Sequence, residues 1–291
     1  MRVAVLSRNP QLYSTHRLVE AGAEHGLDMV VIDHLRCNIS IENNNPVIYY
    51  HGNRLTDIDA IIPRIGSSVT SYGAAVIKQF EMMNIFSSLS SNALLRSRNK
   101  IRSLQKLSNS GLGLPNTVFF DHVNEISQLT DALGELPWVV KLLEGTQGLG
   151  VVLVENMNTA ESVIEAFNTL KAPVIVQEFI KECAGSDIRI LVVDGEIVGA
   201  MKRTSNSGFR SNLHRGGTAE IIQLTDQERD TALLACEAMD LHVAGVDILQ
   251  SNRGPLILEI NSSPGLEGIE RATEEDIASK IIEYVVSKIK K

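Results

Sequence analysis

The sequence predicts a mixed fold that combines an α/β module with α+β modules. Across roughly the first hundred residues, short apolar strands alternate with amphipathic helices, which is the pattern of a small open α/β domain. From Pro115 onward the pattern changes to antiparallel hairpins separated by single helices. A chain of 291 residues that is 44% hydrophobic and 21% charged is long enough to bury roughly two or three such modules.

The first module is built from strands that end at polar residues. We expect one strand at Val3–Leu6, before Ser7 and Arg8, and another that ends in segment 60–66, which contains Arg64. Open sheets bind ligands beyond the carboxyl ends of their strands, so these residues are candidates, although ordinary loop surface is the plainer interpretation. The other elements expected here are helices Thr15–His25 and Ser68–Met83, strand Asp28–Asp33, and a hairpin of Ile48–His51 with Asn53–Leu55 around Gly52.

A single long helix, Leu94–Ser110, is expected to link this module to the rest of the chain, and it ends at Gly111. Further along, Asp194-Gly195 between two apolar strands is a hairpin signal. The remaining predicted elements are strands Thr117–Phe120, Trp138–Leu142, Val151–Glu155, Val174–Phe179, Asp187–Val193 and Ile197–Lys202, a loop at Thr204–Gly217, and helices Asn124–Leu133, Thr159–Leu170, Thr225–Met239 and Glu274–Lys290.

The composition argues against several classes of protein. A net charge of -8 argues against general affinity for nucleic acid, although it leaves room for a local basic pocket. We expect no membrane partner, because no apolar run is long enough to span a bilayer and the first one is too short for a signal peptide. Cys37, Cys183 and Cys236 are odd in number and widely scattered, which excludes a fully paired disulfide framework and indicates a cytoplasmic protein.

Two apolar strand patterns near the C-terminal end carry three oxygen-bearing side chains. A three-residue loop within the turn segment 251–255, with Gly254 in the left-handed conformation, pairs position 251 with 255, 249 with 257 and 247 with 259. Asp247, Glu259 and Asn261 then share one face of the hairpin. Hard oxygen donors without His or Cys suit Mg²⁺ or Mn²⁺, and a cation would offset the repulsion between the carboxylates. An ordinary solvated polar face is the alternative.

A glycine-rich loop between two strands is the second candidate site. The strand at 138–142 delivers Lys141, and Gly145, Gly148 and Gly150 follow before the next strand. Glycine lets backbone N–H groups approach phosphate oxygens closely. The segment is neither a P-loop nor a dinucleotide-binding turn, because the lysine precedes the loop and no helix follows it. It suits a flexible flap over a triphosphate, and the alternative is a plain hairpin loop.

The end of the strand at 174–179 is a candidate edge for a nucleotide base. Gln177, Glu178 and Phe179 end an apolar strand, and backbone polar groups there can pair with adenine. Asp187 follows nine residues after Glu178 and could accept hydrogen bonds from ribose hydroxyls, as acidic residues do in other nucleotide-binding folds. The alternative is a strand boundary with solvated acidic side chains.

A loop rich in cationic residues is the third candidate. Lys202, Arg203, Arg210 and Arg215 lie in or beside it, and it ends at Gly216-Gly217. In a protein of net negative charge, such a loop can stabilise the charge that develops during phosphoryl transfer. The two glycines suggest that it can move and close. A solvent-exposed basic loop is again the alternative.

Taken in order, these segments resemble the ATP-grasp superfamily, and within it the RimK-type ligases that add glutamate to the C-terminus of a ribosomal protein. The resemblance covers nearly the whole chain. It implies an ATP-grasp fold with an N-terminal pre-ATP-grasp α/β domain at 1–97, a central lobe at 98–179 and a C-terminal lobe with the metal site at 180–291. The segments that carry it are 140–148, 177–180, 244–249 and 259–265, Leu6-Ser7-Arg8, Pro63-Arg64-Ile65-Gly66, and above all Arg210-Ser211-Asn212-Leu213-His214-Arg215-Gly216-Gly217.

The resemblance also implies a role for each site residue. Lys100 and Lys141 would hold the α- and β-phosphates of ATP, and Lys141 with Arg210 would act in catalysis. The other implied roles fall to Glu178, Phe179 and Ile180 at the adenine edge, Asp187 at the ribose, Arg210, Ser211 and Asn212 at the phosphates, and Asp247, Glu259 and Asn261 around two Mg²⁺ or Mn²⁺ ions.

The implied reaction converts a carboxylate into an acylphosphate, which the amine of an amino acid then attacks to give an amide, ADP and phosphate. The implied partners are glutamate and the C-terminal tail of a small-subunit ribosomal protein, with no direct nucleic-acid contact and a homo-oligomer, expected to be a tetramer. Two alternatives stay open: a related ligase that joins an amino acid to a small-molecule acid or an amino-group carrier protein, and a nucleotide-binding regulatory module without catalysis, which the intact Lys141, Asp247, Glu259 and Asn261 disfavour.

Overall fold

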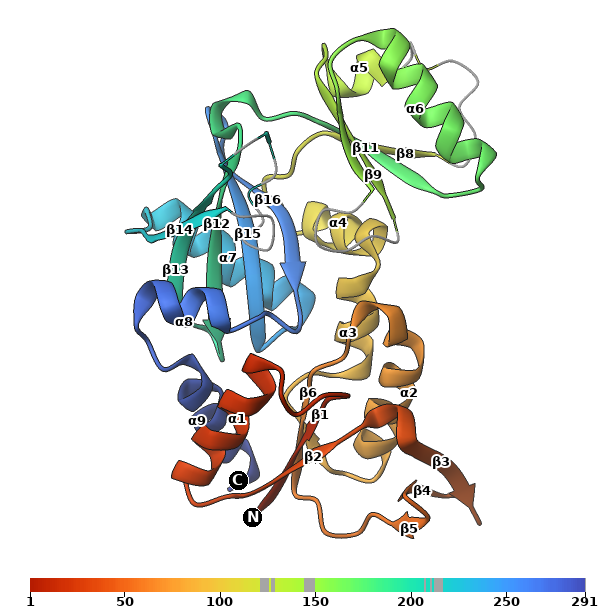
Figure 1. The fold of residues 1–291 in the computed structure, drawn as a ribbon, viewed down its shortest axis with the longest axis vertical. Coiled ribbons are helices and arrows are strands. Elements are labelled where there is room, and N and C mark those ends of the chain that lie inside the picture. Colours follow the sequence, from red (N-terminus) through yellow and green to blue (C-terminus); the bar gives the residue numbers. More distant parts are fainter. Residues whose placement is uncertain are drawn as a thin grey trace.

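The computed structural model describes residues 1–120, 126, 129–143, 150–206, 208–209, 211 and 217–290. Figure 1 shows three parts stacked along the long axis, each built around its own sheet. The N-terminal sheet lies at one end, the C-terminal lobe in the middle, and a central lobe formed by the green segment at the other end. Within the described residues, none of the helices is both long and apolar enough to cross a bilayer.

The N-terminal sheet is parallel, with strand order β2-β1-β6-β7. Its strands β1 and β6 are fully buried from Val3 to Leu6 and from Ala60 to Pro63, as expected of a parallel sheet with both faces covered. A second, three-stranded sheet, β3-β4-β5, includes a first strand that the sequence prediction missed. The elements are β1 (Arg2–Leu6), α1 (Tyr13–Glu24), β2 (Asp28–Ile32), a 3-10 turn (His34–Arg36), β3 (Cys37–Glu42), β4 (Asn45–Tyr50), β5 (Asn53–Arg54), β6 (Ala60–Pro63), a 3-10 turn (Ser67–Val69), α2 (Thr70–Met82) and β7 (Phe86–Ser87).

The link after this sheet consists of two helices, so the prediction of one helix at Leu94–Ser110 was wrong. α3 spans Ser91–Arg98 and α4 spans Lys100–Asn109. Asn99 between them is extended, and its side chain accepts a hydrogen bond from the backbone N–H of Arg102. The short polar side chain of Asn99 therefore ends one helix and caps the next.

The central lobe is a four-stranded antiparallel sheet, β10-β9-β11-β8, with helices on one side. It has a core of its own, which includes Trp138 and Ile164, both fully buried. Of the helix predicted at 124–133, the structure describes Leu129–Leu133 as helical; 124, 125, 127 and 128 lie outside the described residues. The elements are β8 (Thr117–Phe120), α5 (Leu129–Leu133), β9 (Trp138–Leu142), β10 (Val151–Val154), α6 (Met157–Thr169) and β11 (Val174–Glu178).

The C-terminal lobe is a five-stranded antiparallel sheet, β14-β13-β12-β15-β16. A capping box between Thr225 and Glu228 starts its helix α7 as the sequence predicts. The final helix begins at Ile277 rather than at Glu274, because Glu274 is left-handed (φ 57°) and ends the separate helix α8. The elements are a 3-10 turn (Lys181–Cys183), β12 (Ser186–Val193), β13 (Glu196–Thr204), β14 (Thr218–Ile221), α7 (Asp226–Met239), β15 (Val243–Ser251), β16 (Gly254–Asn261), α8 (Glu267–Thr273) and α9 (Ile277–Ile289).

Two cores join the N-terminal sheet to the C-terminal lobe. One cluster includes Ile61 on β6 and Val246 on β15, and the other includes Val5 on β1 and Ile281 on α9. α9 lies beside α1, so the end of the chain returns to its beginning (Figure 1). We call these two joined parts the body. The division at residues 97 and 179 stays a prediction.

Candidate active site

Two lysines from distant segments meet where the central lobe approaches the body. Lys100, the first residue of α4, donates to the backbone oxygens of Leu142 at 3.0 Å and Leu143 at 2.6 Å. Lys141 on β9 donates to the carboxamide oxygen of Gln177. Burial, and after it the charge of Lys100, lowers the pKa of Lys141 to about 8. The structure thus brings the two predicted phosphate ligands together.

The last hairpin brings the three predicted metal ligands together as well. β15 pairs with β16 so that Asp247 is opposite Glu259 and Gly245 is opposite Asn261. The amide nitrogen of Asn261 donates to a carboxylate oxygen of Glu259 at 3.1 Å. The charge of Glu259 opposes the lowering of the Lys141 pKa, so the two groups are near enough to interact electrostatically.

The outer half of the predicted hairpin register was wrong. The loop has two residues, since Ser251 pairs with Gly254, and Leu249 pairs with Leu256 instead of 257. Gly254 does take the predicted left-handed conformation (φ 96°). A bulge at Leu258 then adds one residue to β16 and returns Glu259 to its position opposite Asp247. The bulge therefore keeps both carboxylates in one ladder despite the shorter loop.

Asp247 is 1% exposed and lies beneath two arginines. The guanidinium of Arg189 donates to both of its oxygens, at 2.7 and 2.6 Å, and Arg203 donates a further hydrogen bond at 2.9 Å. Burial alone would raise the pKa of Asp247, but the charges of the two guanidinium groups outweigh it and hold the pKa at about 2. Asp247 is therefore ionised throughout the physiological pH range.

Asp187, the predicted ribose ligand, is 4% exposed and forms a buried pair with Arg203. The Arg203 guanidinium donates to both of its oxygens, one of them at 2.7 Å. Asp187 and Arg203 are directly opposite each other on β12 and β13. The carboxylate is thus held in place by a neighbouring strand, and its role towards ribose stays a prediction.

The hairpin's donor set fits a hard divalent cation in part. Half of the Glu259 side chain is exposed. Partial burial, and after it the negative charge of Asp247, raises the pKa of Glu259. A bound cation would offset the repulsion between these two carboxylates. The oxygen and nitrogen of the Asn261 amide can exchange places by a half-turn, which would present its oxygen beside that of Glu259. In the part of the chain that the structure describes, no three His, Cys, Asp or Glu side chains form a metal cage. The set is therefore of the open kind that phosphate oxygens and water complete.

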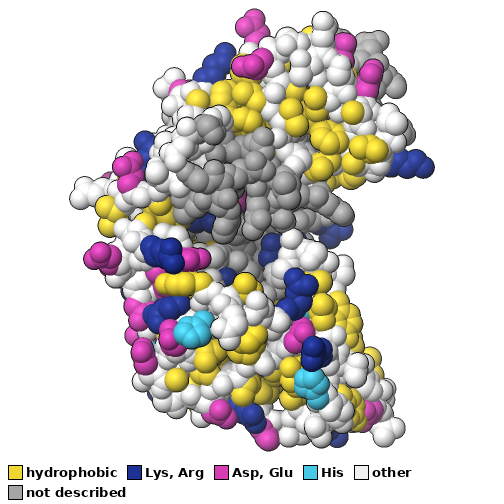
Figure 2. All heavy atoms as spheres, viewed as in Figure 1, with side chains coloured by type: hydrophobic (Ala, Val, Ile, Leu, Met, Phe, Trp, Pro, Cys, Tyr) yellow, Lys and Arg dark blue, Asp and Glu magenta, His cyan; other side chains and the backbone are white. Residues whose placement is uncertain are grey.

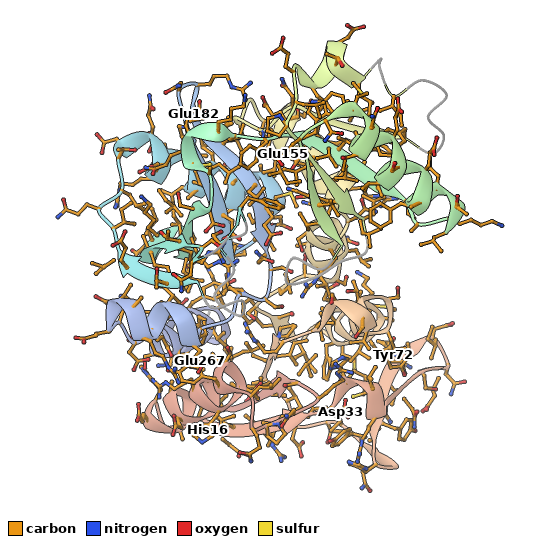
Figure 3. The ribbon with its side chains drawn as sticks, turned by 45° about the horizontal axis from the view of Figure 1, so that its top comes forward. His16, Asp33, Tyr72, Glu155, Glu182 and Glu267 are labelled. Atoms are coloured by element: carbon orange, nitrogen blue, oxygen red, sulfur yellow. The ribbon has the colours of Figure 1, made fainter. Side chains whose placement is uncertain are left out.

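The predicted adenine edge lies at the crossing from the central lobe to the body. The carboxylate of Glu178 accepts from the backbone N–H of Asn116 at 2.6 Å and pairs with Arg253 at the hairpin tip. Phe179 lies edge-on to the ring of Phe209, with 6.2 Å between the centroids. Ile180 is buried in a small cluster of the C-terminal lobe. Figure 3 shows this crossing near the labelled Glu182.

Part of the predicted site lies outside the described residues. Arg210 and Asn212 are there, as are residues 144–149 of the glycine-rich loop and 212–216 of the basic loop. Ser211 is described and is buried, with 9% of its surface exposed. Gly150 has a left-handed conformation (φ 67°), and the strands on either side of the glycine-rich loop pair as predicted, with Lys141 opposite Val151.

Comparison with known proteins decides the family. The family model of the RimK-like ATP-grasp domain matches residues 97–285, and that of the RimK pre-ATP-grasp domain matches residues 1–94. This chain belongs to the RimK-like ATP-grasp family. It is accordingly an ADP-forming carboxylate–amine ligase with an ATP-grasp fold and an N-terminal pre-ATP-grasp domain, as the sequence resemblance predicted.

Close relatives of this RimK-like chain share its whole length. The probable alpha-L-glutamate ligases of Marinomonas sp. (strain MWYL1) and Pseudomonas aeruginosa (strain UCBPP-PA14) are each 57% identical over 286 residues, which is 98% of this chain and 95% of theirs. The solved ATP-grasp ligase PsnB, complexed with minimal precursor, Mg and ADP, has a TM-score of 0.78 at 20% identity, covering 100% of this chain and 98% of that one. D-alanine–D-alanine ligase from Bacillus anthracis complexed with ATP has a TM-score of 0.70 at 20% identity, over 99% and 97%.

The sequence interpretation of this RimK-like chain missed one residue beside the candidate site, Arg189, and the buried position of another, Arg203. A signal for them is present in the sequence, because Asp187 and Arg189 alternate with Ile188 and Ile190 and so share one face of β12. Which strands supply their partners is not readable from that alternation. The sheet order places β12 between β13 and β15, which supply Arg203 and Asp247.

Proposed function

We propose that this RimK-like ligase adds glutamate to the C-terminus of a small-subunit ribosomal protein through an acylphosphate, releasing ADP and phosphate. The names of relatives at 57% identity, probable alpha-L-glutamate ligase, support glutamate as the amino acid. The solved complexes of PsnB with a precursor peptide support a peptide as the acceptor.

One structural observation carries the proposal. Lys141 of the central lobe and Lys100 at the start of α4 lie together, and Asp247, Glu259 and Asn261 lie on the last hairpin, from which the charge of Glu259 acts on Lys141. Cationic side chains on one side and hard oxygen donors on the other suit a triphosphate with its divalent cation. A carboxylate brought against the terminal phosphate there could be activated.

The chain's own residues would perform distinct parts of the reaction. A free carboxylate is a poor acylating agent because its leaving group would be oxide, whereas an acylphosphate releases phosphate. Lys141 and Lys100 would hold the phosphates in line with the attacking carboxylate, and this positioning is most of what phosphoryl transfer needs. The amine of glutamate would then attack the acyl carbon, with Arg210 opposing the negative charge that develops.

Asp247, Glu259 and Asn261 would hold Mg²⁺, which neutralises phosphate charge and orients the terminal phosphoryl group. Arg189 and Arg203 lower the pKa of Asp247 and fix its rotamer, so that the carboxylate is presented to a cation in its charged form. Replacement of Mg²⁺ by Mn²⁺ and the presence of two ions are further parts of the proposal.

The remaining features are proposed on chemistry and on the family resemblance. Glu178, Phe179 and Ile180 would line the adenine, Asp187 would face ribose, and Ser211 with Asn212 would reach the phosphates. The described cysteines Cys37, Cys183 and Cys236 are free and buried, which suits the proposed cytoplasmic location. We propose a homo-oligomer, with a tetramer as the expected state.

The direct test is ADP release by the purified chain with ATP, Mg²⁺ and glutamate, with and without the ribosomal protein. Mass spectrometry of the acceptor should show a ladder of species that differ by one glutamyl residue. With an acceptor truncated at its C-terminus, the enzyme should release no ADP and the acceptor should gain no mass. Turnover on the truncated acceptor, or an unmodified full-length acceptor, would reject the proposed substrate.

A second candidate function is a ligase for a small acid or an amino-group carrier protein. The fold is also similar to that of D-alanine–D-alanine ligase, with a TM-score of 0.70 against 0.78 for PsnB, so the architecture does not restrict the acceptor to a protein tail. Robust glutamate-dependent ADP release with small carboxylic acids, and none with the ribosomal protein, would favour this candidate.

A further inference from the structure

Two arginines stand at the carboxyl edge of the N-terminal sheet, apart from the residues assigned above. β1 and β6 are parallel neighbours with Leu6 opposite Pro63, so the residues that follow them emerge at the same edge. Arg8 follows β1, and its guanidinium lies over Gly66, where a Cβ atom would meet it at 3.6 Å. Arg64 follows β6 and is half-buried, with its backbone N–H bonded to the oxygen of Leu6.

This edge touches the loop that follows the last candidate metal ligand. Arg64 donates to the backbone oxygen of Pro264 at 2.7 Å, and Ser97 on α3 donates to or accepts from Ser262 at 2.8 Å. Arg98, also on α3, donates to the backbone oxygen of Ile65 at 2.7 Å. The loop after Asn261 is therefore enclosed by the N-terminal edge on one side and by the end of α3 on the other.

The cluster formed by Arg8, Arg64 and Arg98 has positive charge that no neighbouring carboxylate in the described part of the chain pairs with. Among the described residues, no carboxylate lies within 4.0 Å of Arg8, Arg64 or Arg98. Burial, and after it the charge of Arg98, lowers the pKa of Arg64 to about 10, and burial also lowers the pKa of Arg98. Within the same described set, Nε of Arg98 and Oγ of Ser263 are buried without a hydrogen-bond partner. Both are donors, and leaving buried donors and guanidinium groups unpaired is costly unless a ligand completes them.

We propose that Arg64 and Arg98, with Ser263 between them and Arg8 at the rim, form the subsite that binds the carboxylates of the incoming amino acid. This inference rests on the proposed function, since it assigns the place of glutamate in that reaction. Guanidinium forks match carboxylates, and a dicarboxylic amino acid needs two such groups. The subsite lies next to Glu259, whose charge acts on Arg98, so a ligand held there is adjacent to the phosphoryl-transfer centre.

The position favours the amino acid over the acceptor's reacting carboxylate. That carboxylate must direct a free oxygen lone pair at the terminal phosphate, and two arginine forks together would occupy all four of its lone pairs. The carboxylates of glutamate take no part in bond formation, whereas its amine must be left free to attack. A pair of arginines beside the reaction centre can hold the carboxylates of glutamate and leave its amine free to attack.

The test measures steady-state KM values in Arg64→Gln and Arg98→Gln, with Arg96→Gln as the matched control. Arg96 lies on the same helix and also donates to a backbone oxygen at 3.1 Å, but this oxygen belongs to Met239 at the end of α7 and not to the subsite. We expect the KM for glutamate to rise about tenfold to a hundredfold in both subsite variants, because each loses a charged hydrogen bond to the ligand. The KM for ATP and the KM for the acceptor should not change. Arg98→Lys keeps the charge without the fork and should give an intermediate rise.

The outcomes separate the subsite from the reaction itself. Unchanged KM values for glutamate in variants that melt like wild type would overturn the subsite while leaving the proposed function intact. A rise in the acceptor's KM instead would assign the arginines to the acceptor's carboxylate and overturn the glutamate assignment. Absence of glutamate-dependent ADP release in the wild type would overturn the proposed function, and the subsite with it. If a glutamine variant does not fold, Arg98→Lys provides the same comparison.

Discussion

Arg189 and Asp247 lie directly opposite each other on β12 and β15, and the guanidinium holds both carboxylate oxygens, at 2.7 and 2.6 Å. A candidate metal ligand is thus also half of a buried ion pair. Glu259, opposite Asp247 on the next strand, has half of its side chain exposed. The two carboxylates therefore differ in what they contribute to the folded state.

Substitution of the two carboxylates should separate chemistry from stability. Asp247→Ala and Glu259→Ala should both abolish acylphosphate formation, measured by trapping with hydroxylamine. Asp247→Ala should also lower the free energy of unfolding by about 3–5 kcal/mol, because Arg189 loses the carboxylate that it holds and Arg203 keeps only Asp187. Glu259→Ala should unfold in urea like wild type. Retained ATP-dependent turnover in both variants would count against the metal assignment.

A buried and an exposed arginine–carboxylate pair should also differ in how much they contribute to stability. Arg203 is 4% exposed and pairs with Asp187 and Asp247, whereas Arg253 is half exposed and pairs with Glu178. Arg203→Met should cost about 3–5 kcal/mol in the free energy of unfolding, and Arg253→Met less than about 1 kcal/mol. Denaturant titrations of both variants under one buffer condition make the comparison. Equal losses would mean that burial does not set the strength of these pairs.

Binding of ATP should weaken at mildly alkaline pH. The pKa of Lys141 is lowered to about 8, so the free enzyme loses this positive charge as pH rises through 8. We expect kcat/KM for ATP to fall above pH 8, and kcat to fall later, because bound phosphate favours the protonated lysine. Lys141→Arg should move the fall to higher pH. A profile of kcat/KM that stays level to pH 10 would contradict the role of Lys141.

His34 should weaken the fold in acid. His34 is fully buried, and both of its ring nitrogens lack a hydrogen-bond partner among the described residues. Burial lowers the pKa of His34 below 6.5. The charge of Asp33 opposes this shift, and the charge of Arg8 adds to it. The unfolded chain therefore takes up a proton first, and stability present above pH 6.5 is lost as pH falls towards the folded-state pKa. His34→Leu should flatten this acid decline in thermal melting, while His25→Leu at an exposed position should not. Parallel pH curves for wild type and His34→Leu would disprove the effect.

Charged side chains of both signs lie on the visible face of the body. Figure 2 shows Lys and Arg side chains beside Asp and Glu side chains there. The net charge of -8 in the sequence does not give their positions, since these depend on which strands become neighbours.

Local sequence patterns were reliable where one element decides the outcome. The strand with Lys141, the turn at Asp194-Gly195 and the helix predicted from Thr225 follow from alternation, turn chemistry and helical periodicity. Asn99 shows the limit, because a polar residue within a helical pattern can be a surface position or a cap, and its neighbours decide which.

The sequence by itself determined that a hairpin carries Asp247 and Glu259, since turn residues at 251–255 join two apolar strands, whereas the two-residue loop and the bulge that set its register came from the structure. The sequence also identified the lysines and glycines by their chemical type. Only the tertiary structure decided that Arg189 and Arg203 hold Asp247 and that Arg64 reaches Pro264, because these contacts join residues 58, 44 and 200 positions apart. Contacts at such separations depend on sheet order and core packing, which no local pattern encodes.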